Sequence, residues 1–153
     1  TLSRSDLLKL YGSCDAFLSL HRAEGFGRGL AEALQLGLDV VATDWSGNTD
    51  FCQGPLAHPV PTQQVPVPPG AYPHWPNQHW ADPDLRVAAQ YLQEIADRPL
   101  NLKSIELSDS YRQQFSAQVC GANYRQCLES LGLINVKQKS ADAMKAPSAH
   151  PPR

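Results

Sequence analysis

The hydrophobic residues at the start of the chain recur first with helical and then with strand spacing. Ser3 and Asp6 have the spacing of an N-terminal capping pair. We therefore expect a helix over residues 4 to 12, in which the apolar residues at helical spacing are Leu7, Leu8, Leu10 and Tyr11. The apolar run from Asp15 to Leu20 then ends in a polar loop that contains glycine. This pattern is typical of a strand that is buried on both faces.

A second helix and a second strand follow. Residues from Gly25 to Leu36 form an amphipathic pattern of about three helical turns, and Gly37 is placed to end it. Val40 to Thr43 is a β-branched strand. Helices and strands that alternate with short connections predict an α/β fold, a Rossmann-like parallel sheet with flanking helices.

The segment from Pro55 to Pro83 interrupts every periodicity, because it contains nine of the thirteen prolines. We expect a long irregular connection here, either without any strand or with a short strand near residues 58 to 60. Regular structure resumes at Asp82 and Pro83, which suit the N-cap and first position of a helix over residues 84 to 97.

The last expected helix covers residues 108 to 131, with candidate packing residues Tyr111, Phe115, Val119, Tyr124, Cys127, Leu128 and Leu131. Beyond Asn135 the composition is rich in Lys, Ser, Ala and Pro. We therefore divide the chain into one domain over residues 1–134 and a disordered tail over residues 135–153.

Composition excludes several classes of protein. The 153 residues are 42% hydrophobic and 18% charged, which is enough apolar material for one domain with a core. The formal net charge of −2 provides no broad positive field for nucleic acid. No apolar run reaches the roughly 20 residues that span a bilayer. We expect a folded cytoplasmic protein with no nucleic-acid partner and no transmembrane segment.

The cysteines and histidines give no metal motif. Cys14, Cys52, Cys120 and Cys127 form no C-x-x-C pair, and we expect them to be buried or half-buried reduced thiols. His74 and His79 lie close together in sequence but have no Cys or carboxylate partners with ligand spacing, so no metal site is expected. The tryptophans nearby either stack on a sugar or base, or cover the proline-rich connection.

The candidate chemistry lies in residues 21–33, which join the first strand to the second helix. Ligands of parallel sheets bind at the carboxyl ends of the strands, and a helix N-terminus offers unpaired N–H groups and partial positive charge to a phosphate. Glycines at 25, 27 and 29 would let a ligand approach the backbone. Glu24 and Glu32 would flank this anion and accept hydrogen bonds from hydroxyls. The alternative is ordinary helix capping with a solvated Glu32.

The same residues resemble a known family. The run Glu24-Gly-Phe-Gly-Arg-Gly-Leu-Ala-Glu32 looks like the E-x7-E motif of family 4 retaining glycosyltransferases, which have the GT-B fold of two Rossmann-like domains. The likeness extends to the preceding helix and strand and to residues 37–51 with their SGN-x-DF loop. The W-A-D-P-D run after His79 resembles members that build bacterial surface polysaccharides. In order, the resemblance covers about residues 2 to 130.

The resemblance implies a role for each matching residue. Glu24 would act at the donor sugar as the catalytic residue, and Glu32 would bind the ribose of the nucleotide. The backbone that faces the sugar and diphosphate would belong to Gly25, Phe26, Gly27, Arg28, Gly29 and Leu30. His21, Asn48 and Thr49 are further candidates for the pocket, although Asn48 and Asp50 could instead cap a short helix while Phe51 packs. Arg22 and Arg28 either lend charge to the diphosphate or are ordinary surface arginines.

The resemblance also implies partners that this chain does not itself supply. The chain starts without Met and at a helix, so we expect it to be the C-terminal part of a GT-B donor-binding domain, cut from a longer protein. A UDP- or GDP-sugar would be the donor substrate, with no separate cofactor. A glycan or lipid-linked acceptor would bind through the missing N-terminal domain, with the full protein cytoplasmic or peripheral at the inner membrane. Alone, the chain should not catalyse transfer. The alternatives are a non-catalytic nucleotide-sugar or phosphate-binding module and an interaction domain.

Overall fold

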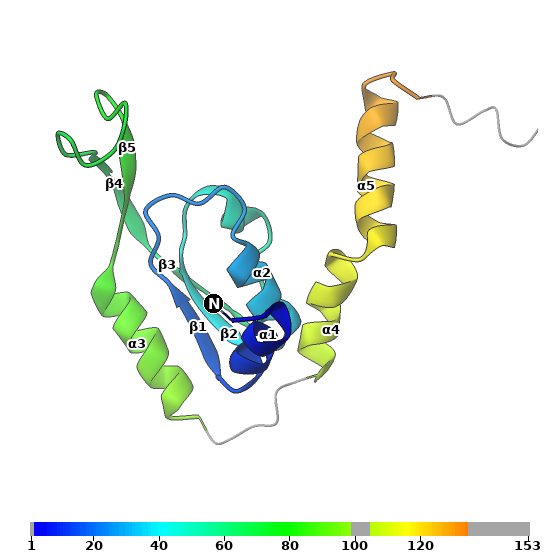
Figure 1. Ribbon diagram of the computed structural model, residues 1–153, viewed down its shortest axis with the longest axis horizontal. Coiled ribbons are helices and arrows are strands. Elements are labelled where there is room, and N and C mark those ends of the chain that lie inside the picture. The colour runs from blue at the N-terminus through cyan, green and yellow to red at the C-terminus, as the bar shows by residue number, and fades with distance from the viewer. Residues whose placement is uncertain (1, 99–104, 135–153) are drawn as a thin grey trace, which may run out of the picture. The chain divides into compact units, whose positions relative to one another are not determined.

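The computed structural model describes residues 2–98 and 105–134 (Figure 1). The chain forms two compact units, residues 1–112 and residues 113–153. The elements in chain order are α1 (Arg4–Gly12), β1 (Ala16–Ser19), α2 (Arg28–Gln35), β2 (Asp39–Thr43), the short 3-10 helix η1 (Ser46–Asp50), β3 (Ala57–Val60), β4 (Thr62–Pro66), β5 (His79–Pro83), α3 (Leu85–Ala96), α4 (Ile105–Gln114) and α5 (Ala117–Ser130).

The centre of the first unit is a parallel sheet with the strand order β1-β2-β3. Phe17 pairs with Val40, and Val41 pairs with His58. Consecutive residues of β2 from Val40 to Thr43 are buried, so both faces of this strand are covered. α2 and α3 are the helices that pack against it. This arrangement confirms the expected α/β class with a parallel sheet and flanking helices. The expectation that the first strand is buried on both faces is wrong, because β1 has no buried residue and Leu18 is 46% exposed.

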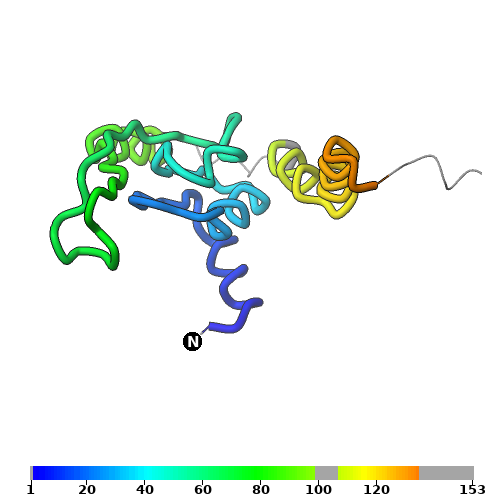
Figure 2. The backbone as a smooth tube through the Cα atoms, turned by 90° about the horizontal axis from the view of Figure 1, so that it is seen from above, coloured from blue at the N-terminus to red at the C-terminus, as the bar shows by residue number. Residues whose placement is uncertain are grey.

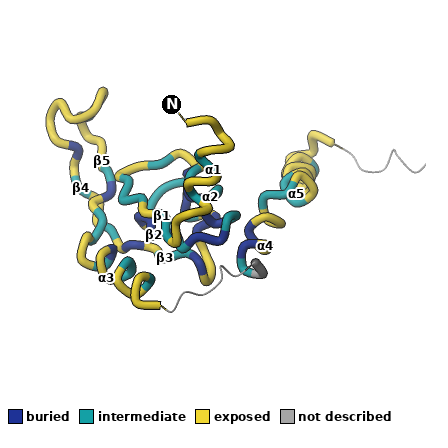
Figure 3. Tube along the Cα trace, turned by 60° about the horizontal axis from the view of Figure 1, so that its bottom comes forward, coloured by how far each residue is buried: buried dark blue, intermediate teal, exposed yellow. Residues whose placement is uncertain are grey.

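The core is concentrated in the sheet and α2 (Figure 3). Val41 and Val60 pack with Ala88 of α3, while Tyr91, Leu92 and Ile95 add a partly buried layer. On α2 the amphipathic pattern buries Leu30, Ala31, Ala33 and Leu34. The first helix begins as expected, because Ser3 Oγ accepts a hydrogen bond from Asp6 N at 3.1 Å.

The short strand expected near residues 58 to 60 is confirmed as β3, but the expectation that the rest of the proline-rich connection is irregular is wrong. This segment contains β3 and an antiparallel hairpin of β4 and β5, in which Gln64 pairs with Ala81 and Val65 with Trp80. The hairpin projects beyond the three-stranded sheet (Figures 1 and 2). Prolines are tolerated because these strands have open edges: Leu56 O and Val60 O face β2, so Pro59 between them turns its missing N–H away from β2.

The hairpin also changes where α3 begins. Pro83 is still in the β ladder, opposite Thr62, so Asp82 cannot be the N-cap. The cap is Asp84, whose carboxylate accepts from Arg86 N at 2.9 Å and Val87 N at 3.3 Å. α3 therefore starts at Leu85, and the expected cap is corrected by two residues.

The expected helix over residues 108 to 131 is in fact two helices. α4 ends at Gln114, and α5 begins after Ser116, whose hydroxyl accepts from Val119 N at 3.2 Å and caps the new helix. Tyr111 is buried as expected, but Tyr124 is 74% exposed and α5 has no buried residue. The expected disordered tail, residues 135–153, lies outside the described residues.

The cysteines are less uniformly buried than expected. Cys52 is buried and Cys120 is intermediate, but Cys14 and Cys127 are exposed. Cys14 lies in the turn after α1 rather than in β1, which removes it from the sheet. Burial raises the pKa of the Cys52 thiol to about 11, although a hydrogen bond with Asn48 acts in the opposite direction. Among the described residues, no helix is long and apolar enough to cross a membrane.

Candidate functional site

Two loops meet at the carboxyl ends of β1 and β2. Because the strands are parallel, the loop after β1, which carries Glu24, and the loop after β2, which forms η1, leave the same edge of the sheet. Gly47 N donates to Glu24 O at 3.1 Å. A side chain at Gly47 would collide with the carbonyl group of Gly25, so only glycine permits this close approach.

Ser46 holds the backbone of Glu24 from the second loop. Its hydroxyl accepts from Glu24 N at 3.0 Å and donates to Glu24 O. Ser46 adopts this position with a φ of 78°, which is unusual for a residue other than glycine. Strained backbone of this kind persists where the surrounding contacts enforce it. The side chain of Glu24 turns back so that Oε1 accepts from Gly25 N at 3.0 Å.

The three glycines of the motif differ in what they permit. Gly27 is the N-cap of α2 with a φ of 87°, so the helix begins at Arg28 rather than at Gly25 as expected. A side chain at Gly29 would press against Phe17, 3.1 Å away. Only at Gly25 would a side chain of this group meet open space. Gly25 is therefore the position where the loop leaves room for a ligand.

The N-terminus of α2 has no side-chain cap. The first N–H groups of a helix lack partners within the helix and carry partial positive charge, so they can bind an anion. Glu32 lies one helical turn beyond Arg28, and its side chain is 18% exposed. Its Oε1 atom lies 3.0 Å from Arg4 of α1 and 3.8 Å from Arg28. A hydroxyl group that bound this carboxylate would therefore share it with two guanidinium groups.

His21 and Asn48 are brought together, in the interior of the two loops. His21 Nε2 lies 3.0 Å from Asn48 Oδ1 and 3.2 Å from Trp45 O. Trp45 O is a backbone carbonyl and therefore an acceptor. Asn48 uses its Nδ2 atom to donate to Thr43 O, so its Oδ1 atom is an acceptor as well. Nε2 is thus the protonated nitrogen. Thr49 uses its hydroxyl to donate to Ser46 O at 2.8 Å. These three residues stabilise the loops, and Asn48 is only 1% exposed.

Arg22 connects the motif loop to the hairpin. Its guanidinium carbon lies 4.6 Å from the centre of the Trp80 ring, and one of its nitrogens lies 3.4 Å from Asp82 Oδ1. Ala81 N also donates to Arg22 O at 2.9 Å. Asp82, which the sequence suggested as a helix cap, therefore pairs with an arginine two residues before Glu24. Arg22 therefore has protein partners on the hairpin.

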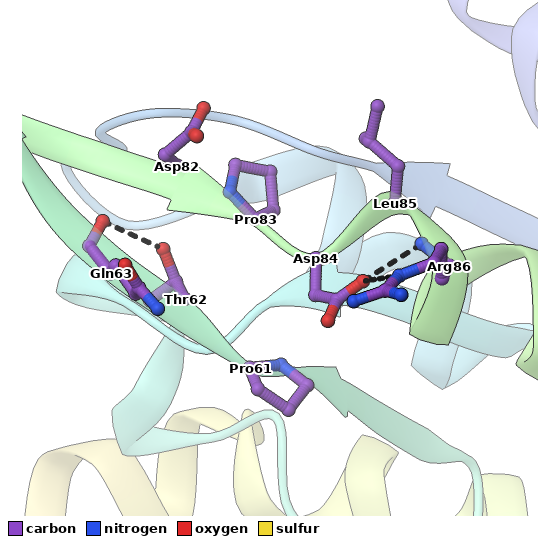
Figure 4. Close-up of a pocket in the computed structure, with 8 residues that line it drawn as sticks. All are labelled: Pro61, Thr62, Gln63, Asp82, Pro83, Asp84, Leu85 and Arg86. Carbon is purple, nitrogen blue, oxygen red and sulfur yellow. Dashed lines mark hydrogen bonds and ion pairs between the residues drawn. The ribbon is translucent and has the colours of Figure 1, made fainter.

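A separate hollow lies where the hairpin meets α3 (Figure 4). It measures about 480 Å³ and is lined by Pro61, Thr62, Gln63, Asp82, Pro83, Asp84, Leu85 and Arg86. None of the residues expected from the sequence to bind the donor lines it. The described residues include no group of three or more His, Cys, Asp or Glu side chains placed to hold a metal ion.

Sequence reasoning missed four contributors to this site. Ser46 and Gly47 fix the backbone of Glu24, Arg4 pairs with Glu32, and Trp80 stacks on Arg22. The Ser-Gly pair was visible as a turn signal between a strand and Asn48. The contacts of Arg4 and Trp80 join residues far apart in the chain, and no local pattern indicates them.

Comparison with known proteins gives one match. Searches of the curated proteins and of the solved structures returned no match to this chain. A family model described as "Glycosyl transferases group 1" matches residues 1–53, which include α1, β1, the motif loop, α2, β2 and η1. The part of the chain that carries Glu24, Glu32 and Ser46 is therefore similar to glycosyl transferases of group 1.

Proposed function

We propose that this chain supplies part of the donor site of a retaining glycosyltransferase of the family 4 type. The donor is a UDP- or GDP-sugar, and its glycosyl unit passes to a glycan or lipid-linked acceptor that binds elsewhere in the full protein. Glu24 acts at the sugar, the backbone from Gly25 to Leu30 faces the sugar and diphosphate, and Glu32 binds the ribose.

The fixed backbone of Glu24 is the observation that carries this proposal. Ser46 and Gly47 hold its N–H and carbonyl groups, Gly25 beside it adjoins open space, and the uncapped N-terminus of α2 follows within four residues. A preorganised carboxylate beside an anion-binding helix end is what a nucleotide sugar needs, because its diphosphate and its sugar hydroxyls require opposite kinds of partner. The match of residues 1–53 to group 1 glycosyl transferases supports the same function.

Calorimetric titration of the chain with UDP and GDP tests the nucleotide part of this site. We expect Glu32→Gln to weaken binding about tenfold, because a neutral amide accepts hydrogen bonds from ribose hydroxyls less strongly than a carboxylate. Stability should change by less than about 1 kcal/mol, since the arginine partners of Glu32 are largely exposed. Glu94→Gln, on the exposed surface of α3, is the matched control and should bind like the parent.

The outcomes separate the candidate functions. Nucleotide affinity that falls in Glu32→Gln supports the donor site, and equal affinity in the variant and the parent rejects the ribose role of Glu32. Affinity without donor hydrolysis or transfer, when the chain is joined to the rest of its protein, would favour a non-catalytic binding module. No affinity for either nucleotide would favour an interaction domain.

A further inference from the structure

The β4–β5 hairpin contacts the motif loop at Arg22. Three contacts converge there: the Trp80 ring beneath the guanidinium, the Asp82 carboxylate at 3.4 Å, and the backbone bond from Ala81 N to Arg22 O. Trp80, Ala81 and Asp82 are consecutive in β5, whose ladder with β4 keeps them in register. Arg22 is thus held by a side chain on each flank and by the backbone between them.

These contacts are poorly suited to a purely stabilising role. The side chains of Arg22 and Asp82 are 48% and 55% exposed, and exposed ion pairs add little to the free energy of folding. A guanidinium stacked on an aromatic ring and paired with a carboxylate does, however, fix orientation, because its plane and its N–H directions are both specified. The fixed segment lies two residues before Glu24.

We propose that the β4–β5 hairpin is a positioning element for the loop that carries Glu24, and that Arg22 is the positioning residue through which it acts. The loop is then held at two places. The Ser46 hydroxyl forms hydrogen bonds with the backbone of Glu24, and Trp80 and Asp82 contact Arg22 two residues earlier. Loss of the hairpin contact frees the loop on one side while the Ser46 contact remains.

The effect on ligands rests on the proposed function. Because Glu24 is assigned to the sugar and Glu32 to the ribose, a displaced Glu24 weakens binding of a nucleotide sugar but leaves the free nucleotide unaffected. Glu32 belongs to α2, and its partner Arg4 belongs to α1, so neither depends on the hairpin. The hairpin is therefore a determinant of sugar binding and not of nucleotide binding.

Two variants weaken the side-chain contacts between Arg22 and the hairpin, and two matched variants retain them. Arg22→Gln removes the charge at a half-exposed position, and Trp80→Leu removes the ring. Trp80→Phe keeps an aromatic face, although a smaller one, and removes the indole Nε1, which has no hydrogen-bond partner among the described residues. Arg86→Gln removes an equal charge from a side chain that is 95% exposed and pairs with Asp84 at the start of α3.

Amide hydrogen exchange tests the positioning without any ligand. In Arg22→Gln and Trp80→Leu, amides in residues 22–27 should exchange at least fivefold faster, whereas amides of β2 should be unchanged. Trp80→Phe and Arg86→Gln should stay within twofold of the parent. Unchanged exchange in Arg22→Gln, or equal exchange in the Phe and Leu variants, overturns the inference. Arg22→Gln keeps the test decisive if Trp80→Leu fails to fold.

Titration with UDP-glucose and UDP, and with the matching GDP pair, tests the consequence for binding. We expect Arg22→Gln to lower affinity for the nucleotide sugar about tenfold and to change affinity for the free nucleotide by less than twofold. Equal losses for both ligands overturn the assignment to the sugar. If the parent binds neither ligand while exchange responds as expected, the proposed function fails and the positioning role stands.

Discussion

At the scale of single residues, backbone conformation decides where the candidate carboxylate lies. Ser46 and Gly27 both have positive φ; Gly27 ends the loop that contains Glu24, and Ser46 contacts this loop from η1. For Gly27 the absence of a side chain removes the steric cost of this conformation. For Ser46 the cost is offset by two hydrogen bonds to Glu24. The loop is therefore shaped before any ligand arrives, which is a condition for the proposed role of Glu24.

Replacement of Glu24 tests whether its carboxylate binds the sugar or mainly shapes the loop. Glu24→Ala should lower affinity for a nucleotide sugar about 10- to 100-fold, the effect of losing hydrogen bonds to a charged group, and should leave affinity for the free nucleotide nearly unchanged. Glu24→Gln is the control, because its amide oxygen can still accept from Gly25 N and keep the loop in place. Titration of both variants with UDP-sugar and UDP checks this. Equal losses for the two ligands would mean that Glu24 mainly shapes the loop.

At the scale of elements, local patterns predicted the parts of the fold that depend on neighbours in sequence. The alternation of α1, β1, α2 and β2 follows from periodicity, and Ser3 marks the first helix start. The β4–β5 hairpin was missed because its register depends on pairs such as Thr62 with Pro83, which no local pattern encodes. Once β5 extends to Pro83, the cap of α3 must move from Asp82 to Asp84.

The candidate site, like the fold, was predictable from local patterns only in part. Glu24, Glu32 and the glycine motif were visible from spacing, and their binding roles stay predictions. What spacing could not predict is which groups surround them. Arg4 reaches Glu32 across 28 positions of sequence, and Ser46 reaches Glu24 across 22. Such contacts form only after α1, α2 and the sheet have packed together.

Asp39 ties three elements together. It lies at the start of β2, accepts a hydrogen bond from His58 of β3, and pairs with Arg98 just after α3 at 3.1 Å. Burial alone would raise the pKa of Asp39, but the hydrogen bond from His58 and the charge of Arg98 outweigh it, so the pKa lies below the usual 3.8. A depressed pKa stabilises the fold at pH values above the unfolded pKa.

Asp39→Asn should therefore be less stable than the parent at pH 7, by about 1–3 kcal/mol. The difference should shrink as the pH falls below about 4 and towards the lower folded pKa, because protonation removes the same charge from the parent. Urea unfolding of both proteins at several pH values measures this. Asp109→Asn is the control, since its pair with Arg112 is exposed and should contribute little. A difference that does not change with pH would contradict the role of the carboxylate charge.

At the scale of the whole molecule, the sheet of the described residues has an open edge. β1 pairs with β2 on one side only, and Leu18 in the middle of β1 is 46% exposed. An apolar strand with an open edge can pair with a strand from another chain. In the second unit, Tyr124 of α5 is 74% exposed, and Leu131, the C-cap of this helix, is 64% exposed. Both units thus present apolar surface to solvent.

Self-association through β1 is the expected result for the chain in isolation. The apparent mass measured by light scattering should rise with protein concentration. Leu18→Lys should suppress this rise, because a charged side chain on an edge strand disfavours pairing. Leu18→Val keeps the apolar edge and should associate like the parent. A monodisperse monomer with a cooperative melting transition would contradict an association-prone edge.

Because the Cys52 thiol is buried, the rate at which it is alkylated measures how often the core opens. With a pKa of about 11, roughly one Cys52 side chain in ten thousand is a thiolate at pH 7, and the residue is 6% exposed. Iodoacetamide should therefore modify the exposed Cys14 and Cys127 in the folded protein and reach Cys52 only during opening events. Mass spectrometry of timed samples would then report how often the core around η1 opens, and comparable labelling rates for Cys14 and Cys52 would show that this core is not closed in solution.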